Sequence, residues 1–279
     1  MIRIALLSVL FVLTSLTPPG AALAADEGKR ITVGIVPQQS ATRLAILWTP
    51  ILRHLSEQTG YTLEFKTARD IPTFEKRLAE GEYDIAYMNP YHYTVFGRDP
   101  GYRAFAAEKD RLLTGIVVVP KDKEYKELAE LNGKTIALPA PAAFAASVLV
   151  HAMFTDADVN VEPKYVASHD SVYRAVVQGL YPAGGGVIRT YNNLDAEIRD
   201  QLKIAWKTKS YTPHPFAAHP RVPREVIERI EQAMLAMDQS EAGKSLLTSI
   251  NFKGLRQVRD AEYDSVRALR IGVLKTAKP

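Results

Sequence analysis

Segments with the pattern of β-strands alternate with helix-like segments along the first half of this chain, and this alternation limits the fold more than any other feature. The strand-like segment 31–36 is rich in β-branched residues and ends before Pro37, and the helix-like segment that follows it ends before Gly60. Strands joined through helices pair in parallel and are covered on both faces. We therefore predict an α/β fold with a mainly parallel sheet, built from strands at 31–36, 61–66 and 85–88 and helices at 44–59 and 71–80.

A second series of the same kind follows the apolar segment 113–119, which ends at Pro120 and which we interpret as a strand leaving the first domain. The predicted elements are a helical turn at 128–131, strands at 135–138 and 164–166, helices at 142–154 and 172–178, and a short strand Val187-Ile188 after the cluster Gly184-Gly185-Gly186. Further helices are predicted at 194–201, 223–237, 241–249 and 261–272. The chain is long enough for two α/β domains.

The first 24 residues have the pattern of a secretory signal peptide. Arg3 precedes a mainly apolar run of 13 residues, 4–16, and the small-residue box Ala22-Leu23-Ala24 follows. That run is shorter than the ~20 residues of a membrane span. Cleavage after Ala24 leaves 255 of the 279 residues, with no cysteine for lipid attachment or disulfides. We predict a free, monomeric, periplasmic protein that is not inserted in the membrane after cleavage.

The net charge excludes some partners. It is +4 for the whole chain and +3 once Arg3 is removed with the signal peptide, with both signs spread along the sequence. Nucleic-acid binding would require a basic stripe interleaved with aromatic residues. The mild positive charge weakly favours small anionic ligands.

No motif predicts catalysis, a metal or a cofactor. Gly133-Lys134-Thr135 resembles the end of a phosphate-binding loop, but Leu128 stands where that motif requires glycine. The neighbours Ser168-His169-Asp170 cannot point at one another as a hydrolase triad does. We interpret His214 and His219, in a Pro-rich loop, as solvated histidines.

The predicted ligand-binding residues follow the strands, because open α/β sheets bind ligands at the carboxyl ends of their strands. Each group has an alternative: the tyrosines could pack in the core, the 168–171 turn could only cap a helix, and Arg189 could lie on the surface. Helix-start amides at Ala142 and Ala143 are suited to an anion. The candidates are Gln38, Gln39, Ser40, Tyr87, Asn89, Tyr91, Tyr93, Ala142, Ala143, Ser147, His169, Asp170 and Arg189.

The ordered set of motifs resembles the phosphate-, phosphite- and phosphonate-binding proteins of ABC transporters, a family of type II periplasmic binding proteins. The resemblance covers nearly the whole mature chain and is carried by Val36-Pro37-Gln38, Gly81-x-x-Asp84-Ile85-Ala86 ending in Asn89-Pro90, Leu131-Asn132-Gly133-Lys134, and Ser168-His169-Asp170 with Ala175-Val176 and Gly179. It implies two lobes joined by two crossover hinge strands, each lobe a mixed, mainly parallel sheet flanked by helices. The implied lobes are residues 30–116 with 212–279, and 117–211. It also implies that hinge closure encloses the ligand.

The chain departs from that family at two places. The loop after the Leu-x-Gly-Lys strand usually carries a Ser-Thr-Ser-Gly-like run that binds the phosphonate, whereas here residues 141–147 are Ala-rich and Ser147 alone has a hydroxyl. After Gly179 the family commonly has an acidic residue, whereas this chain reaches Arg189. We therefore expect a more cationic and more apolar pocket, suited to a larger oxyanion with a hydrophobic portion.

The first functional hypothesis is a non-enzymatic solute-binding protein that delivers a phosphonate-, phosphite- or phosphate-like anion, or an organic acid, to an inner-membrane ABC permease. A ligand sensor that signals to a membrane receptor kinase needs the same hinge and is a second hypothesis. A periplasmic hydrolase is a third, for which no nucleophile and base are visible.

Overall fold

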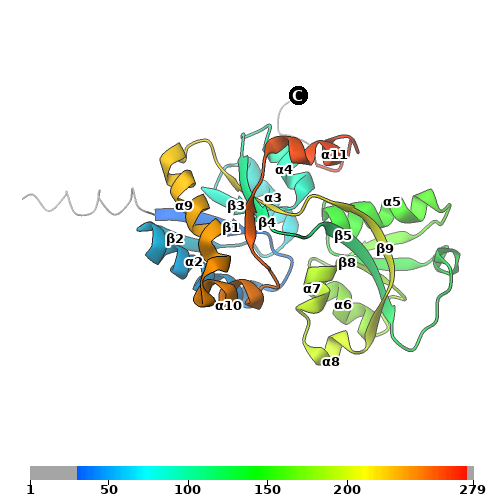
Figure 1. Ribbon diagram of the computed structural model, residues 1–279. Helices are drawn as coiled ribbons and strands as arrows, with labels where there is room; N and C mark the ends of the chain where they lie inside the picture. Colours follow the sequence, from blue (N-terminus) through cyan, green and yellow to red (C-terminus); the bar gives the residue numbers. More distant parts are fainter. Residues whose placement is uncertain (1–29, 275–279) are drawn as a thin grey trace, which may run out of the picture.

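The computed structural model describes residues 30–274 and contains two β-sheets, seen side by side in Figure 1. The six strands of the first sheet lie in the order β11-β4-β10-β3-β1-β2, and the five strands of the second in the order β7-β6-β8-β5-β9. The first sheet consists of β1 (Arg30–Ile35), β2 (Thr62–Lys66), β3 (Ile85–Tyr87), β4 (Arg103–Glu108), β10 (Pro215–Ala218) and β11 (Leu255–Gln257). The second consists of β5 (Leu113–Pro120), β6 (Thr135–Leu138), β7 (Glu162–Tyr165), β8 (Gly184–Val187) and β9 (Leu202–Tyr211).

Both sheets are mixed, with four parallel and five antiparallel strand pairings between them. β1 pairs in parallel with β2 and β3, while β10 runs antiparallel to β3 and β4, and β11 antiparallel to β4. In the second sheet β6 is parallel to β7 and β8, and β5 is antiparallel to β8 and β9. The carboxyl ends of β1, β3, β6 and β8 therefore supply loops that can meet between the sheets.

The chain crosses between the sheets twice, at residues 109–112 and at residues 212–214. We call residues 30–108 with 215–274 the first lobe and residues 113–211 the second lobe. The boundary predicted between residues 116 and 117 falls inside β5, whose pairing partners all lie in the second sheet. The boundary predicted between 211 and 212 coincides with the end of β9.

Helices cover the first sheet, and their starts follow capping residues. Ser40, Asp70 and Asn89 each accept a backbone N–H three residues on, which satisfies a free amide of the first turn. The helices are α2 (Ala41–Thr59), α3 (Ile71–Ala79), α4 (Pro90–Phe96), α9 (Arg224–Ala236), η3 (Met237–Gln239), α10 (Glu241–Ser249), η4 (Asp260–Tyr263) and α11 (Asp264–Arg267).

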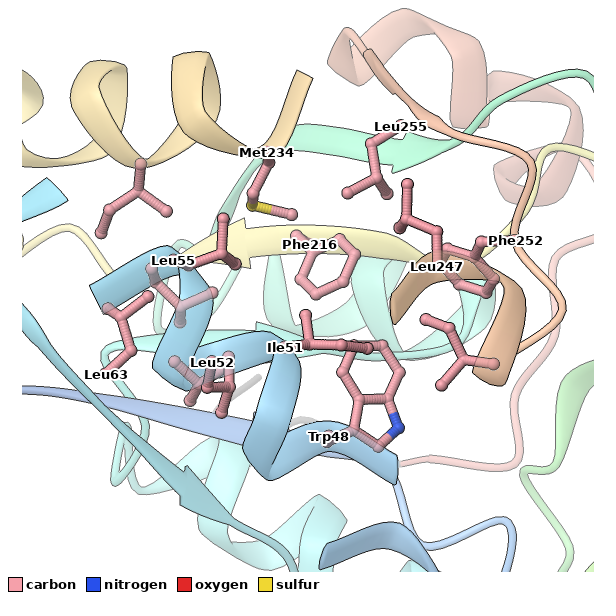
Figure 2. Close-up of a pocket in the computed structure, with 14 residues that line it drawn as sticks. Trp48, Ile51, Leu52, Leu55, Leu63, Phe216, Met234, Leu247, Phe252 and Leu255 are labelled. Carbon is pink, nitrogen blue, oxygen red and sulfur yellow. The ribbon is translucent and has the colours of Figure 1, made fainter. Parts of the chain in front are cut away.

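The core of the first lobe lies where α2, α9 and α10 pack on the sheet. Figure 2 shows Trp48, Ile51, Phe216 and Met234 converging there, around a space of about 20 Å³ lined by apolar residues only. A cavity without polar groups cannot hold a water by hydrogen bonds. It is a packing space within the core and supplies no binding chemistry.

The second lobe carries shorter helices on its sheet. They are η1 (Leu128–Leu131), the π-helical turn η2 (Phe144–Val148), α5 (Leu149–Asp156), α6 (His169–Val177), α7 (Ile188–Asn192) and α8 (Ala196–Arg199). η2 runs directly into α5, so the two form one continuous helical segment. This segment packs over β5 and β8.

Several elements differ from their predicted form. The glycine cluster is the strand β8 itself, and Ile188 already begins α7. The helix predicted from residue 142 begins at Phe144, the helix predicted from 172 begins at His169, and the helix predicted to reach 272 ends at Arg267. Strands β4, β9, β10 and β11 and helix α4 were not predicted.

Two further expectations concern membranes and the N-terminus. Between residues 30 and 274 no helix has the length and apolar character required to cross a bilayer. The predicted signal peptide, residues 1–24, lies outside the described residues.

Candidate functional site

Polar groups from both lobes meet where β1, β3, β6 and β8 end. The backbone N–H of His169, in the second lobe, donates to the carbonyl of Gln38, in the first, at 3.0 Å. Asn89 Nδ2 donates to the carbonyl of Ala142 at 3.0 Å. These bonds join the loops after β1 and β3 to the starts of α6 and η2, so the lobes are in contact across an interlobe cleft.

A small enclosed space lies in this cleft at the start of η2, and we call it the helix-end cavity. It encloses about 10 Å³, room for about one water molecule. Its walls combine apolar side chains with four neutral polar ones. The lining residues are Val36, Gln38, Ile71, Asn89, Ala143, Phe144, Ala145, Ala146, His169, Val187 and His214.

The start of η2 contributes backbone donors to this cavity. Within the helix, the first bonds to a preceding carbonyl run from the amides of Ser147 and Val148 to Ala143. The amides of Phe144, Ala145 and Ala146 precede those bonds, as the first amides of any helix do. They give this end of the helix a partial positive charge.

Glycines in the two strands beneath η2 allow the start of this helix to lie close to the sheet. A Cβ at Gly185, in β8, would lie 2.0 Å from the Ala146 carbonyl oxygen, and one at Gly115, in β5, would lie 2.2 Å from that of Ala145. Larger residues on either side would therefore push the helix start off the sheet. The Ala-rich run and the glycine cluster are complementary, and together they place the helix end at the cleft.

Asn89 is held by a network within the first lobe. Its Oδ1 accepts from the His92 N–H at 2.7 Å, as the cap of α4. His92 Nε2 lies 2.9 Å from Glu75 Oε1 and 3.0 Å from Asn89 Nδ2. Oδ1 is thereby committed to the helix, and Nδ2 faces the second lobe.

The two histidines of the cavity are buried, and burial keeps them uncharged. Desolvation and the nearby Arg189 lower the pKa of His169 to about 3. The pKa of His214 is lowered well below its ordinary value, first by burial and then by Arg189, His92 and His169. A neutral imidazole carries one donor and one acceptor nitrogen. His169 Nδ1 lies 3.2 Å from Thr190 Oγ1, so Nε2 remains for the cavity.

The interpretation of His214 as a solvated loop residue was wrong. Its side chain is buried and stacked on Tyr87, with ring centroids 5.2 Å apart, and its Nε2 lies 3.3 Å from Gln38 Nε2. His219 is partly exposed and packs edge-on against Tyr102. The crossing segment 212–214 carries His214 into the cleft because β10 begins at the next residue.

Arg189, which we expected in a loop after the predicted strand Val187-Ile188, lies on α7, one residue after the start of this helix. Its guanidinium donates to Tyr87 Oη and to Gln38 Oε1, both in the first lobe. It also lies over the rings of Tyr87 and Phe252, at 5.3 and 5.5 Å from their centroids. The direct partners of this half-buried cation are therefore neutral.

Other predicted residues lie beside the helix-end cavity. Gln39 is buried and, with Tyr87 and Arg189, lines an adjoining space of about 20 Å³. The Ser40 N–H lies 3.4 Å from Asp170 Oδ2, a further bond between the lobes. Asp170 Oδ1 is buried and has no hydrogen-bond partner among the described residues.

The structure does not bring all predicted residues into the cavity. Tyr91 Oη donates to the carbonyl of Ile271 and accepts from the N–H of Leu274, and Tyr93 Oη donates to Asp260 Oδ1 at 2.6 Å. Both hydroxyls therefore contact the C-terminal segment. Ser147 Oγ is buried without a partner among residues 30–274, and Ser147 is not one of the cavity-lining residues.

The chain is similar to known proteins over most of its length. The chain matches, over residues 33–263, the family described as ABC transporter, phosphonate, periplasmic substrate-binding protein. It is 25% identical over 274 residues to the phosphate-import protein PhnD of Mycolicibacterium smegmatis, an alignment that covers 85% of this chain and 84% of that protein.

Two solved structures share the fold. A binding protein component of an ABC phosphonate transporter from Pseudomonas aeruginosa superposes with a TM-score of 0.78 at 18% identity, covering 86% of this chain and 85% of that one. PhnD1 from Prochlorococcus marinus, in complex with methylphosphonate, superposes with a TM-score of 0.76 at 16% identity, covering 87% and 97%. The predicted two-lobed type II fold is confirmed.

Proposed function

Because the chain belongs to the family of periplasmic substrate-binding proteins of phosphonate ABC transporters, we propose that it binds a phosphorus oxyanion in the interlobe cleft and presents it to an inner-membrane permease. In this proposal the mature protein works in the periplasm, after loss of the predicted signal peptide, and carries out no chemical step. The family match favours transport over the receptor-kinase alternative. Methylphosphonate, the ligand of the Prochlorococcus structure, is the reference compound.

The observation that supports this proposal most is the convergence of neutral donors on the start of η2. Helix-start amides come from the second lobe, and Gln38 and Asn89 come from the first. Preorganised N–H groups at a helix start are well suited to phosphoryl oxygens. Uncharged His169 adds a ring nitrogen that can accept a hydrogen bond from a protonated oxygen or donate one to a charged oxygen.

The closed geometry also indicates how the ligand enters. The helix-end cavity has room for about one water, which is less than a phosphonate group requires. The lobes must therefore separate at residues 109–112 and 212–214 before the oxyanion can reach the helix start. Such hinge motion is the usual way in which two-lobed binding proteins take up ligands.

A calorimetric and thermal-shift screen tests the proposal. Phosphate, phosphite and methylphosphonate are measured beside acetate and sulfate, and at least one phosphorus oxyanion should bind more tightly than both controls. A ligand present at 100 times its dissociation constant raises the free energy of unfolding by about 2.7 kcal/mol.

The variant His169→Ala should weaken that binding at least tenfold, since a hydrogen bond to a charged group contributes about 1.5–3 kcal/mol. His151→Ala is the matched control, because His151 is exposed on α5. It should leave the dissociation constant within twofold. The proposal fails if no phosphorus oxyanion binds, or if His169→Ala binds it as wild type does.

A further inference from the structure

A second, larger space lies beside the two crossing segments, and we call it the hinge cavity. It encloses about 120 Å³, compared with about 10 Å³ for the helix-end cavity. Much of its wall is apolar, from side chains of β5, β8 and the crossing segments. The lining residues are Tyr87, Glu108, Arg111, Leu112, Leu113, Thr114, Val187, Ile188, Arg189, Pro213 and His214.

The charged groups of the hinge cavity do not balance. Arg111 and Arg189 bring two guanidinium groups, and Glu108 brings one carboxylate, with only 4% of its surface exposed. Arg111 Nε lies 3.2 Å from Glu108 Oε1, which pairs one cation with the only carboxylate of the lining. Arg189 donates its hydrogen bonds to the neutral Tyr87 and Gln38, and its charge acts on the same single carboxylate.

The Arg111 side chain, which lines this wall, also carries one donor that has no acceptor. Arg111 Nη1 is buried and forms no hydrogen bond with any residue in the described range 30–274. A buried guanidinium N–H without an acceptor is costly, and native structures rarely leave one so. With one positive charge in excess, the group that fits beside Arg111 and Arg189 is an anionic acceptor.

The hinge cavity adjoins the helix-end cavity. Val187 and His214 line both, so the two spaces lie on either side of one wall. The His214 ring in this wall stacks on Tyr87, and its Nε2 lies 3.3 Å from Gln38 Nε2, so a ligand that spans both spaces has to displace this ring. A ligand with a short carbon chain can then extend from one space into the other.

We propose that the hinge cavity receives the carboxylate of a phosphonocarboxylate, whose phosphorus group lies at the start of η2. This inference rests on the proposed function and specifies its ligand class. Arg111 and Arg189 bind the carboxylate oxygens, and the apolar side chains Leu113, Val187 and Ile188 contact the carbon chain. Glu108 orients Arg111 and does not touch the ligand.

The main alternative is a ligand that carries a positively charged group in place of the carboxylate. An ammonium group could pair with Glu108, whose Oε1 accepts no hydrogen bond. It would, however, enter a wall that already holds two guanidinium groups, and like charges at short range repel. An aminoalkylphosphonate should therefore bind more weakly than a phosphonocarboxylate of the same length.

The test measures the dissociation constants of phosphonoacetate, 3-phosphonopropionate, 2-aminoethylphosphonate and methylphosphonate by calorimetry. At least one phosphonocarboxylate should bind tenfold or more tightly than methylphosphonate, and 2-aminoethylphosphonate should bind no more tightly than methylphosphonate. If phosphate, phosphite and all four of these compounds fail to bind, the proposed function is wrong. If methylphosphonate binds and neither phosphonocarboxylate binds more tightly than methylphosphonate, only the present inference is wrong. Tighter binding of the amine than of both phosphonocarboxylates also overturns it.

Arg111→Gln should remove the preference, bringing the phosphonocarboxylate to within about twofold of methylphosphonate, whose own affinity stays unchanged. Arg111→Gln leaves the Glu108 carboxylate without its ion pair. The double variant Glu108→Gln/Arg111→Gln is therefore measured as well, and it should lose the preference for the phosphonocarboxylate in the same way. Arg103→Gln is the matched control, because Arg103 is exposed at the opposite end of β4. A preference retained in both Arg111 variants, or lost equally in Arg103→Gln, contradicts the assignment of Arg111.

Discussion

Two uncharged histidines, His169 and His214, lower the stability of the protein in acid. Both have pKa values far below the ordinary 6.5, because burial and Arg189 disfavour the imidazolium. Between pH 6.5 and the folded-state pKa, the unfolded chain binds more protons than the folded one. The free energy of unfolding therefore decreases as the pH falls below about 6.5, by about 2 kcal/mol for each such histidine at pH 5.

Urea unfolding at pH 7 and pH 5 measures the free energy of unfolding and tests this prediction. Glu108 and Asp170 have raised pKa values because of burial, and they oppose the decrease as they take up protons. Comparing wild type with His169→Asn cancels these contributions. The decrease from pH 7 to pH 5 should be smaller in His169→Asn by about 2 kcal/mol. The exposed control His151→Asn should show the wild-type decrease, and an equal decrease in all three proteins contradicts the argument.

The types of residue that follow the strands indicated where the candidate site lies. The sequence did not reveal in which direction each side chain points. The predicted residues Gln38, Asn89, Ala143 and His169 meet in the helix-end cavity. Their binding role stays a prediction. His214 was missed because its burial depends on β10, a strand that forms only by pairing with β3 and β4.

Tyr91 and Tyr93 show the same limit. The density of aromatic residues after β3 favoured a cleft wall. In the structure these residues form the short helix α4, which directs both hydroxyls to the C-terminal segment. Local spacing cannot predict a hydrogen-bond partner that lies about 170 residues away in the sequence.

At the level of secondary structure, the long segments with a clear period were predicted well. The short segments that form only through tertiary pairing and packing were not. α2, α9 and α10 carry clear helical spacing and were found close to their predicted bounds. β8 is the opposite case, because three consecutive glycines have the weakest strand propensity. They form a strand because β5 and β6 pair with it and η2 packs on it.

This packing predicts that Gly185→Ala is strongly disruptive. The added Cβ would lie 2.0 Å from the Ala146 carbonyl oxygen and 2.6 Å from Leu138 Cδ2, so the start of η2 must move. The free energy of unfolding should fall by about 1–3 kcal/mol, and ligand affinity should fall as well because the helix-start amides move. Gly272→Ala, where a Cβ meets nothing within 4 Å, should change the free energy of unfolding by less than about 0.5 kcal/mol. A Gly185→Ala protein with wild-type stability and affinity would refute the close approach.

Apart from the crossing segments, the two lobes as a whole are joined by the bonds of Arg189 to Tyr87 and Gln38, by apolar packing, and by further hydrogen bonds. Three of the interlobe hydrogen bonds lie near the helix-end cavity: Asn89 Nδ2 to Ala142 O, His169 N to Gln38 O, and Ser40 N to Asp170 Oδ2. Asn251 Nδ2 donates to Asn193 Oδ1, and neither residue lines the helix-end cavity. Because a ligand bound between the lobes favours the closed form, every bond that also favours closure raises the apparent affinity.

The bond between Asn251 and Asn193 can be removed without changing a residue that lines the helix-end cavity or the hinge cavity. Asn251 has φ of +59°, a conformation that glycine adopts freely, so Asn251→Gly removes the side chain and keeps the backbone. If the bond contributes about 1 kcal/mol to closure, the dissociation constant should rise about fivefold. Small-angle scattering should show a larger radius of gyration for the ligand-free variant and a wild-type value at saturating ligand. Asp158→Gly is the control, since Asp158 has φ of +55° in an exposed loop of the second lobe. Equal losses of affinity in both glycine variants would mean that the effect comes from chain flexibility and not from the interlobe bond.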